Sequence, residues 1–298
     1  MYSQITANKR KSVVLMMIFI AIIIGLGYVF SYAQGDTTYA GVWFAIIFSL
    51  FSTSISYFSG DKIALWTSGA KPVKREENLY LYRMIENLCI AQGVKTIPKI
   101  YVMEDAAINA FATGRNPAHA SIAVTRGALE KLENEELEGV LAHELSHITN
   151  YDIRFMMLVA VLVGSISILA NIFLRSRFMF GGRRDSNSGG GQLGAIFMII
   201  GIILAILSPI IAELIKLAIS RRREYLADAS GALLTRYPEG LAKALEKIAQ
   251  ENMPLKTASD ATAHLFISNP FGGKKLHTLF SSHPPVAERV KRLREMGV

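Results

Sequence analysis

Two histidines and a glutamate lie close together near the middle of the chain, in the segment His143-Glu144-Leu145-Ser146-His147. Residues four apart on a helix lie one turn apart on the same face, so both imidazoles can reach a single metal ion. Glu144 projects beside that ion, where a carboxylate can take a proton from water activated by zinc. The HExxH pattern therefore predicts a hydrolytic zinc site with His143 and His147 as ligands and Glu144 as general base.

The segment that must position these side chains, residues 134–151, has the periodicity of a buried helix. Its apolar residues recur at intervals of three and four, namely Leu137, Val140, Leu141, Leu145 and Ile148. We expect Asn134 to cap this helix and the glutamates that follow to favour the positive end of its dipole. The competing interpretation is an ordinary helix with two surface histidines and a solvated glutamate, because short motifs also occur by chance.

A catalytic zinc site needs a third protein ligand, and residues 220–228 (SRRREYLAD) offer two acids one turn apart. Glu224 is the candidate third ligand, and Asp228 is placed to accept the distal N–H of a ligating histidine. The simpler alternative is that both acids pair with the adjacent arginines. Glu213 and Lys216 are rivals, but they lie at the expected membrane boundary and could pair with each other.

The composition is that of a membrane protein with a soluble part, since 51% of the 298 residues are hydrophobic. Four apolar runs are long enough to span a bilayer, at residues 13–32, 40–58, 155–174 and 194–212. The net charge is +8, and lysine and arginine cluster beside these runs. This placement favours membrane anchoring over a nucleic-acid-binding face, so we expect contact with a lipid bilayer and no nucleic-acid partner.

The distribution of basic residues also predicts the topology. The loop between the first two runs has no lysine or arginine, whereas both outer flanks have several, which places the N-terminus, the catalytic domain and the C-terminus in the cytoplasm. Four arginines within residues 175–184 oppose that rule, so the second hairpin either spans the membrane or packs against the protein, and its length favours spanning. Either arrangement keeps His147 and Glu224 on the same side.

We expect four successive parts: an N-terminal transmembrane hairpin (residues 1–60), the first part of the catalytic domain with the HExxH helix (61–152), a second hydrophobic hairpin (153–219), and the second part of the catalytic domain (220–298). Short β-rich runs at residues 99–103, 108–113 and 121–125 predict a small sheet. The expected fold class is a membrane α+β protein, mostly helical, with four candidate transmembrane helices. The single cysteine, Cys89, lies on the apolar side of a helix expected over residues 76–90, which indicates a buried thiol.

Two further segments hold candidate binding residues. Asn109, Ala110, Phe111 and Ala112 could present a strand edge to an extended peptide, or they could form an ordinary strand. His283 precedes two prolines that open the last expected helix. It could donate to the oxyanion of a tetrahedral intermediate, or it could bond locally.

Four motifs in this order resemble those of the M48 family of membrane zinc metalloproteases, and the likeness covers nearly the whole chain. They are NAFATG (109–114), HELSH (143–147), RRREYLAD (221–228) and SHPPVAERV (282–290). The resemblance implies a gluzincin-type site in which His143, His147 and Glu224 bind zinc, Glu144 is the base, Asp228 supports a ligand, the Asn109 segment is the substrate edge, and His283 has a role. It also implies a bacterial inner membrane, a stress response, and damaged or misassembled membrane proteins as substrates.

We therefore expect a cytoplasm-facing zinc metalloendopeptidase that holds one Zn²⁺ per chain and cleaves membrane proteins or unfolded polypeptides. One alternative is a prenyl-protein endopeptidase of the related Ste24 type, for which the chain has few candidate spans. The other is a non-catalytic zinc-binding membrane scaffold, which would not need Glu144. The sequence carries no signal for a particular oligomeric state.

Overall fold

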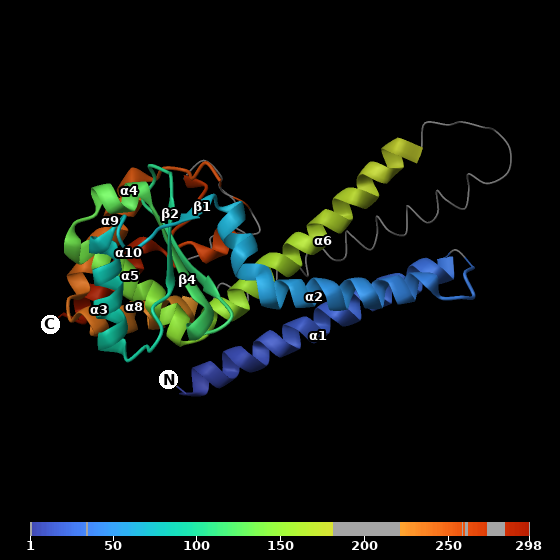
Figure 1. Ribbon diagram of the computed structural model, residues 1–298, viewed down its shortest axis with the longest axis horizontal. Coiled ribbons are helices and arrows are strands. Elements are labelled where there is room, and N and C mark those ends of the chain that lie inside the picture. The colour runs from blue at the N-terminus through green and yellow to red at the C-terminus, as the bar shows by residue number, and fades with distance from the viewer. Residues whose placement is uncertain are drawn as a thin grey trace.

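The computed structural model of the chain describes residues 2–33, 35–180, 221–257, 259, 262–272 and 284–297. It shows a globular part of packed helices and one sheet, from which three long helices extend (Figure 1). These helices are α1 (Tyr2–Ala33), α2 (Ala40–Thr67) and α6 (Asp152–Phe180).

The first two long helices are apolar enough to cross a membrane, over Ile5–Tyr32 and Ala40–Thr67. The predicted run at 155–174 lies inside α6. Together with the preceding helix, from which it is bent by 82°, the first part of α6 meets the same length and hydropathy criteria as one broken span. The described part of the chain thus holds two candidate spans, or three if the bent pair counts as one. The predicted run at 194–212 lies outside the described residues.

The long helices pack on one another through apolar side chains. Leu15, Phe19 and Ile23 of α1 belong to one buried cluster with Leu158 and Leu162 of α6. The first helix therefore begins beside the globular part and runs outward along the start of α6, and α2 returns to the globular part, as Figure 1 also shows.

The sheet has four strands in the order β1-β2-β4-β3. Their bounds are β1 (Ala70–Pro72), β2 (Lys99–Met103), β3 (Ala110–Gly114) and β4 (Ala120–Thr125). Only β2 and β4 pair in parallel, and β3 is an edge strand paired antiparallel to β4. The sequence predicts β2, β3 and β4 to within two residues, but it misses β1, which is too short for an alternating pattern to be visible.

Helices cover the sheet and form most of the globular part. They are α3 (Leu79–Gln92), α4 (Arg126–Lys131), α5 (Asn134–Thr149), α8 (Arg221–Thr235), α9 (Pro238–Glu251) and α10 (Val286–Glu295). Gly93, which has a left-handed φ of +73°, ends α3. Cys89 on this helix is buried, and burial raises the pKa of its thiol to about 11, so it is a core residue.

The central helix α5 starts differently from our expectation. Its N-cap is Glu133 and not Asn134, which is the first helical residue. The reason is a capping box: the carboxylate of Glu136 accepts from the Glu133 N–H at 2.8 Å. The expected apolar stripe is buried, and further α5 residues between its members are buried too.

Neighbouring helices approach α5 closely at positions without side chains. A Cβ added to Gly139 would lie 2.7 Å from the backbone N of Leu241 on α9. A Cβ added to Gly231 of α8 would lie 3.0 Å from the backbone N of His143. These glycines therefore let α8 and α9 pack directly on the helix that carries the HExxH motif.

We expect Gly139→Ala to lower the midpoint of thermal unfolding, because backbone atoms of Leu241 must move. The cost of overpacking, about 1–3 kcal/mol, exceeds the roughly 1 kcal/mol that alanine gains as a helix former. Gly164→Ala in α6 is the control, since an added methyl group there meets nothing within 4 Å. Equal unfolding midpoints for the two variants would contradict this account of the packing.

Candidate metal centre

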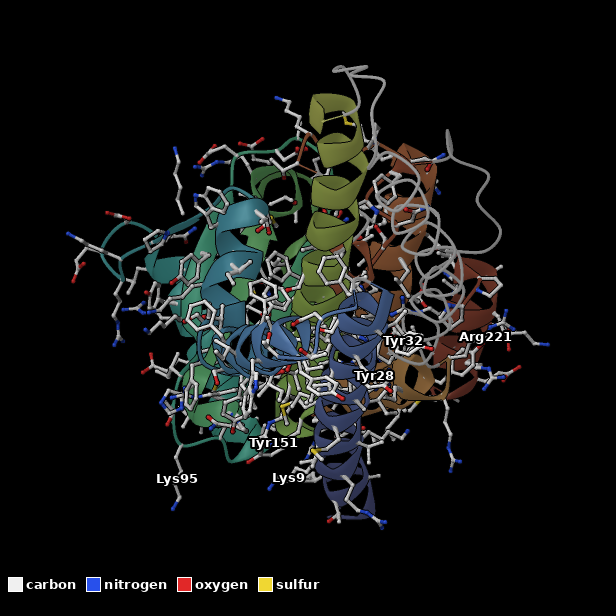
Figure 2. The ribbon with its side chains drawn as sticks, turned by 90° about the vertical axis from the view of Figure 1, so that its right-hand side faces the viewer. Lys9, Tyr28, Tyr32, Lys95, Tyr151 and Arg221 are labelled. Atoms are coloured by element: carbon white, nitrogen blue, oxygen red, sulfur yellow. The ribbon has the colours of Figure 1, made fainter. Side chains whose placement is uncertain are left out.

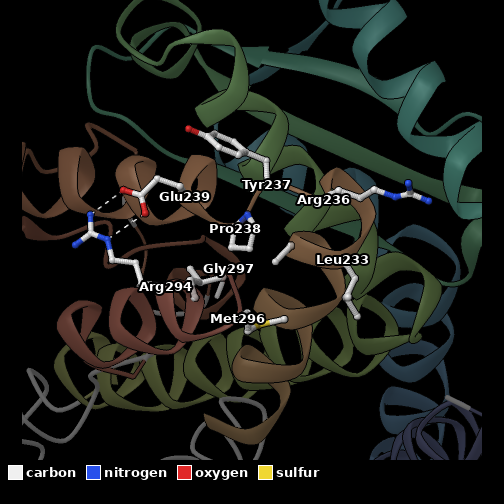
Figure 3. Close-up of a pocket in the computed structure, with 10 residues that line it drawn as sticks. Leu233, Arg236, Tyr237, Pro238, Glu239, Arg294, Met296 and Gly297 are labelled. Atoms are coloured by element: carbon white, nitrogen blue, oxygen red, sulfur yellow. Dashed lines mark hydrogen bonds and ion pairs between the residues drawn. The ribbon is translucent and has the colours of Figure 1, made fainter.

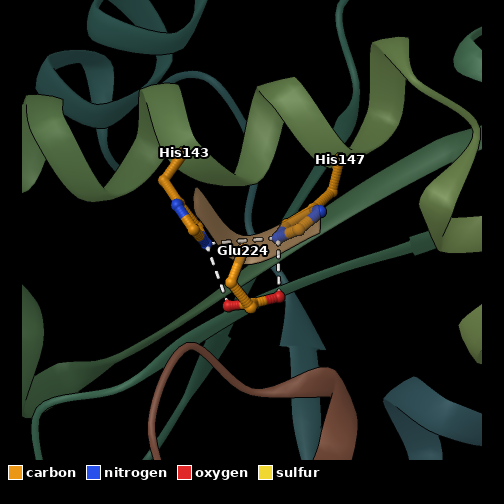
Figure 4. A group of neighbouring side chains, drawn as sticks. All are labelled: His143, His147 and Glu224. Carbon is orange, nitrogen blue, oxygen red and sulfur yellow. Dashed lines mark hydrogen bonds and ion pairs between the residues drawn. The ribbon is translucent and has the colours of Figure 1, made fainter. Parts of the chain in front are cut away.

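Three potential metal ligands converge in the globular part. His143 and His147 of α5 face Glu224 of α8 (Figure 4), and one ligand atom from each residue lies within 4.8 Å of the other two. The two imidazole Nε2 atoms are 3.1 Å apart. Glu224 places Oε2 at 3.8 Å from His143 Nε2 and Oε1 at 3.6 Å from His147 Nε2. All three side chains are buried.

These residues fit a zinc ion. Tetrahedral zinc with ligands at about 2.0–2.1 Å would place those ligand atoms roughly 3.3 Å apart, close to the spacing of this cluster. Each imidazole also turns its Nδ1 toward a carboxylate, which leaves both Nε2 atoms directed at the same point. At 3.1 Å the two Nε2 atoms need either a metal cation or a shared proton between them, because two facing nitrogen lone pairs repel. The donor set and its orientation therefore both suit the predicted metal.

Asp228 lies behind His143, one helical turn from Glu224. Its Oδ1 is 2.9 Å from His143 Nδ1, within hydrogen-bond distance although the alignment is not that of a hydrogen bond. Burial lowers the pKa of His143 to about 4, against the opposing effect of Asp228. His143 is therefore neutral at pH 7, which is the form that binds a metal.

A buried arginine that we did not predict holds Asp228 in place. Arg289 of α10 donates from Nε and Nη2 to the two oxygens of Asp228, at 2.9 and 2.6 Å, and from Nη1 to the Ile267 carbonyl at 3.3 Å. Burial alone would raise the pKa of Asp228. The positive charge of Arg289 has a larger effect in the opposite direction and holds that pKa at about 2. The sequence held one signal that Arg289 is buried: it lies one helical turn before Leu293, on the same face of α10.

His147 has its own acidic partner, Asp152, which sequence reasoning also missed. Asp152 Oδ2 lies 3.1 Å from His147 Nδ1, and Arg223 Nε lies 4.0 Å from Asp152 Oδ1. Burial opposes a charge on His147, but Asp152 and then Glu224 outweigh it and raise the pKa of His147 to about 9. Asp152 comes after the end of α5, so the helical spacing that pairs Glu224 with Asp228 gives no signal for it.

Glu144 lies beside the cluster and contacts the sheet. The backbone N–H of Ala112 lies near its carboxylate and acts to lower the pKa of Glu144, as do the nearby charges of His147 and Arg289. Burial raises the pKa of Glu144 to about 7, in the range where a carboxylate can accept and return a proton at neutral pH. The role of Glu144 as general base stays a prediction.

The strand edge at Asn109, Ala110, Phe111 and Ala112 is less open than we expected. Ile267 N–H donates to the Ala110 carbonyl at 2.9 Å, and Phe111 forms an antiparallel bridge with Phe266. All four residues of the segment are buried. The physical reason is that residues 266–267, which have no strand pattern of their own, already pair with half of this edge.

The remaining candidates lie elsewhere. His283, Glu213 and Lys216 fall outside the described residues. His264 is buried, and its Nε2 lies 2.9 Å from the Met156 carbonyl. A separate surface hollow lies between the end of α8, the start of α9 and the end of α10 (Figure 3), and none of the residues that line it belongs to the metal cluster.

Comparisons with known proteins identify the class. The sequence profile of peptidase family M48 matches residues 75–297, and the chain belongs to this family. The predicted family is thereby confirmed, and the chain is a membrane metalloprotease by its family and its apolar helices.

Individual relatives extend the likeness to the full length. A protein named Protease HtpX homolog from Caldanaerobacter subterraneus subsp. tengcongensis is 47% identical over 100% of this chain and 98% of its own length. One of the same name from Tropheryma whipplei is 41% identical, over 100% and 99%. The crystal structure of S. mikatae Ste24p is similar in fold, with a TM-score of 0.51 at 22% identity over 98% of this chain and 67% of that chain.

We expect Arg289→Leu to destabilise the protein by about 3–5 kcal/mol, because it leaves the charge of Asp228 buried beside a single imidazole. Zinc content should fall with it, since Asp228 no longer holds His143. Lys291→Leu on the same helix is the matched control, because its pair with Glu295 is exposed and surface pairs contribute about 0–1 kcal/mol. Thermal unfolding and metal analysis measure both effects, and an Arg289 variant as stable as the Lys291 variant would refute this role.

Proposed function

We propose that the chain is a zinc-dependent endopeptidase that hydrolyses peptide bonds of membrane proteins, including damaged or misassembled ones and other unfolded polypeptides. The observation that carries the proposal is the convergence of His143, His147 and Glu224 in one buried cluster, with Glu144 beside it. A purely structural zinc site has no need of a buried carboxylate next to its ligands. The presence of Glu144 there favours hydrolysis over a non-catalytic scaffold.

The roles of the residues follow from their positions. One Zn²⁺ per chain, held by His143, His147 and Glu224, would supply the Lewis acid that polarises the scissile carbonyl. Glu144 takes a proton from the attacking water and passes it to the leaving amine. Asp228 and Asp152 keep each imidazole in the tautomer with Nε2 free for the metal. His283 is our candidate donor to the oxyanion.

The substrate chain would bind in extended form along β3. Residues 266–267 already pair with Ala110 and Phe111, so we propose that the peptide lies toward Ala112, the end of the Asn109–Ala112 edge next to Glu144. Main-chain hydrogen bonds made there depend little on side chains, which suits a protease with many substrates.

The setting we propose is the cytoplasmic face of the bacterial inner membrane, with four spans. His147 is bonded to Asp152, the first residue of the apolar helix α6, so the cluster lies near the membrane end of the globular part. Substrates at or near the bilayer are therefore within reach. The absence of lysine and arginine from residues 35–39, against several on both flanks, supports the orientation.

The likeness in fold to Ste24p keeps one alternative, a prenyl-protein endopeptidase. A farnesylated peptide and an unlipidated membrane protein tested side by side separate the two. Cleavage of the lipidated peptide alone would favour the alternative.

We expect Glu144→Gln to keep near-stoichiometric zinc and to lose proteolysis by about 10²–10⁴-fold, because the amide cannot accept the proton. Glu135→Gln, an exposed residue at the start of the same helix, is the matched control and should keep both properties. Metal analysis with a casein or membrane-protein assay, in the presence and absence of a chelator, measures the outcome. Equal turnover by the Glu144 variant would rule out the mechanism.

The orientation can be tested with a membrane-impermeant maleimide on intact cells. The one native cysteine is buried with a raised pKa, so it gives little background. We expect Thr37→Cys, in the loop between α1 and α2, to be labelled from outside, and Lys95→Cys, exposed on the globular part, to be labelled only after lysis. The reverse pattern would invert the proposed topology.

A further inference from the structure

The metal centre has a contact with the first membrane helix that the proposed mechanism does not use. Asn8 of α1 is 2% exposed, and its Nδ2 donates to the Asn150 carbonyl at 2.9 Å and to Asp152 Oδ1 at 2.6 Å. Both partners can only accept, so the amide must present its NH₂ group to them. Both protons of that group are therefore committed to the segment that follows α5.

Asp152 links this amide to the metal ligand. One of its oxygens accepts from Asn8, and the other contacts His147 Nδ1 at 3.1 Å. Asn8, Asp152 and His147 are each at most 4% exposed, so water does not compete for these bonds. Two consecutive hydrogen bonds thus connect the apolar helix α1 to Nδ1 of His147. The other ring nitrogen of His147, Nε2, faces the proposed metal site.

The bend that carries Asp152 needs such support. The chain turns by 82° between α5 and α6, and Tyr151 at the bend has a φ of +60°, a conformation that is costly for an aromatic residue. The side chain next to Asn8 also engages the bend, since Lys9 Nζ lies 4.4 Å from the centre of the Tyr151 ring (Figure 2). Asn8 and Lys9, two successive residues of α1, therefore both contact the bend between α5 and α6.

We propose that Asn8 is a positioning residue of the metal centre, so that the first membrane helix completes the site. Asn8 fixes the Asp152 carboxylate, and Asp152 fixes the ring of His147 with Nε2 directed at the metal. Retention of the metal then depends on how α1 is seated against the bend. This inference rests on the proposed ligand set and adds to it a residue from a segment that precedes the matched family region.

The test compares zinc affinity of full-length variants in detergent by competition with a chelator. Asn8→Ala and the isosteric Asn8→Asp, which has no amide donor, should each weaken zinc binding several-fold, less than the ~10–100-fold expected for a direct partner of a ligand. Asn8→Gln keeps the NH₂ group and should recover part of the affinity. Ser12→Ala is the matched control: Ser12 is buried on α1 one turn away, but its hydroxyl bonds only within that helix, to the Asn8 carbonyl.

Two further readouts separate positioning from general stability. The absorption spectrum of the cobalt-substituted protein should change in Asn8→Ala and remain that of the native chain in Ser12→Ala. In an Asp152→Ala background, Asn8→Ala should have no additional effect on zinc affinity, because the two residues act in series.

Native affinity and a native cobalt spectrum in Asn8→Ala, or an equal loss in both backgrounds, would overturn the inference and leave the proposed function intact. A native chain that binds no zinc, or a His147→Ala variant that binds it normally, would overturn both. Should Asn8→Ala fail to fold, Asn8→Asp and Asn8→Gln decide the question, since their side chains differ in the donor that the inference requires.

Discussion

Charge balance in a buried space is the constraint on which the rest of this structure depends. Glu144, Asp152, Glu224 and Asp228 are all buried around two imidazoles, and buried carboxylates need cations or hydrogen bonds to offset their loss of water. Arg289 balances Asp228, and Arg223 approaches Asp152. The point between His143, His147 and Glu224 is where a divalent cation would complete the balance. We therefore expect metal binding and folding to be linked in this chain.

The fold meets this constraint with helices from distant parts of the sequence. Helix α5 supplies the imidazoles and the proposed base, and α8 supplies the proposed carboxylate ligand and, one turn later, the carboxylate behind His143. Helix α10 supplies the arginine, while α6 and α1 supply the support of His147. Because α1, α2 and α6 are also the apolar helices, the site is built where the globular part meets the membrane segments. We expect a protease assembled in this way to keep its chemistry beside the bilayer.

The sequence predicted those features that depend on local spacing. One-turn spacing identified His143 with His147 and Glu224 with Asp228, and apolar periodicity identified the buried face of α5. Local spacing could not identify Asp152 and Asn8. Asp152 meets His147 only because the chain bends after α5, and Asn8 lies 144 positions before Asp152 in the sequence. The pairing of residues 266–267 with β3 could not be predicted, because these residues have no strand pattern in the sequence. Asn134 is a better cap by propensity alone, but the reciprocal bond between Glu133 and Glu136 decided the start of α5.

X-ray absorption at the zinc edge of the metal-loaded, full-length protein tests the central claim most directly. The account predicts one zinc ion with two imidazole nitrogens and oxygen ligands at about 2.0–2.1 Å and no sulfur. Replacing Glu224 with alanine should remove an oxygen ligand or the metal itself. A spectrum with one imidazole, or one that is unchanged when Glu224 is removed, would contradict the account.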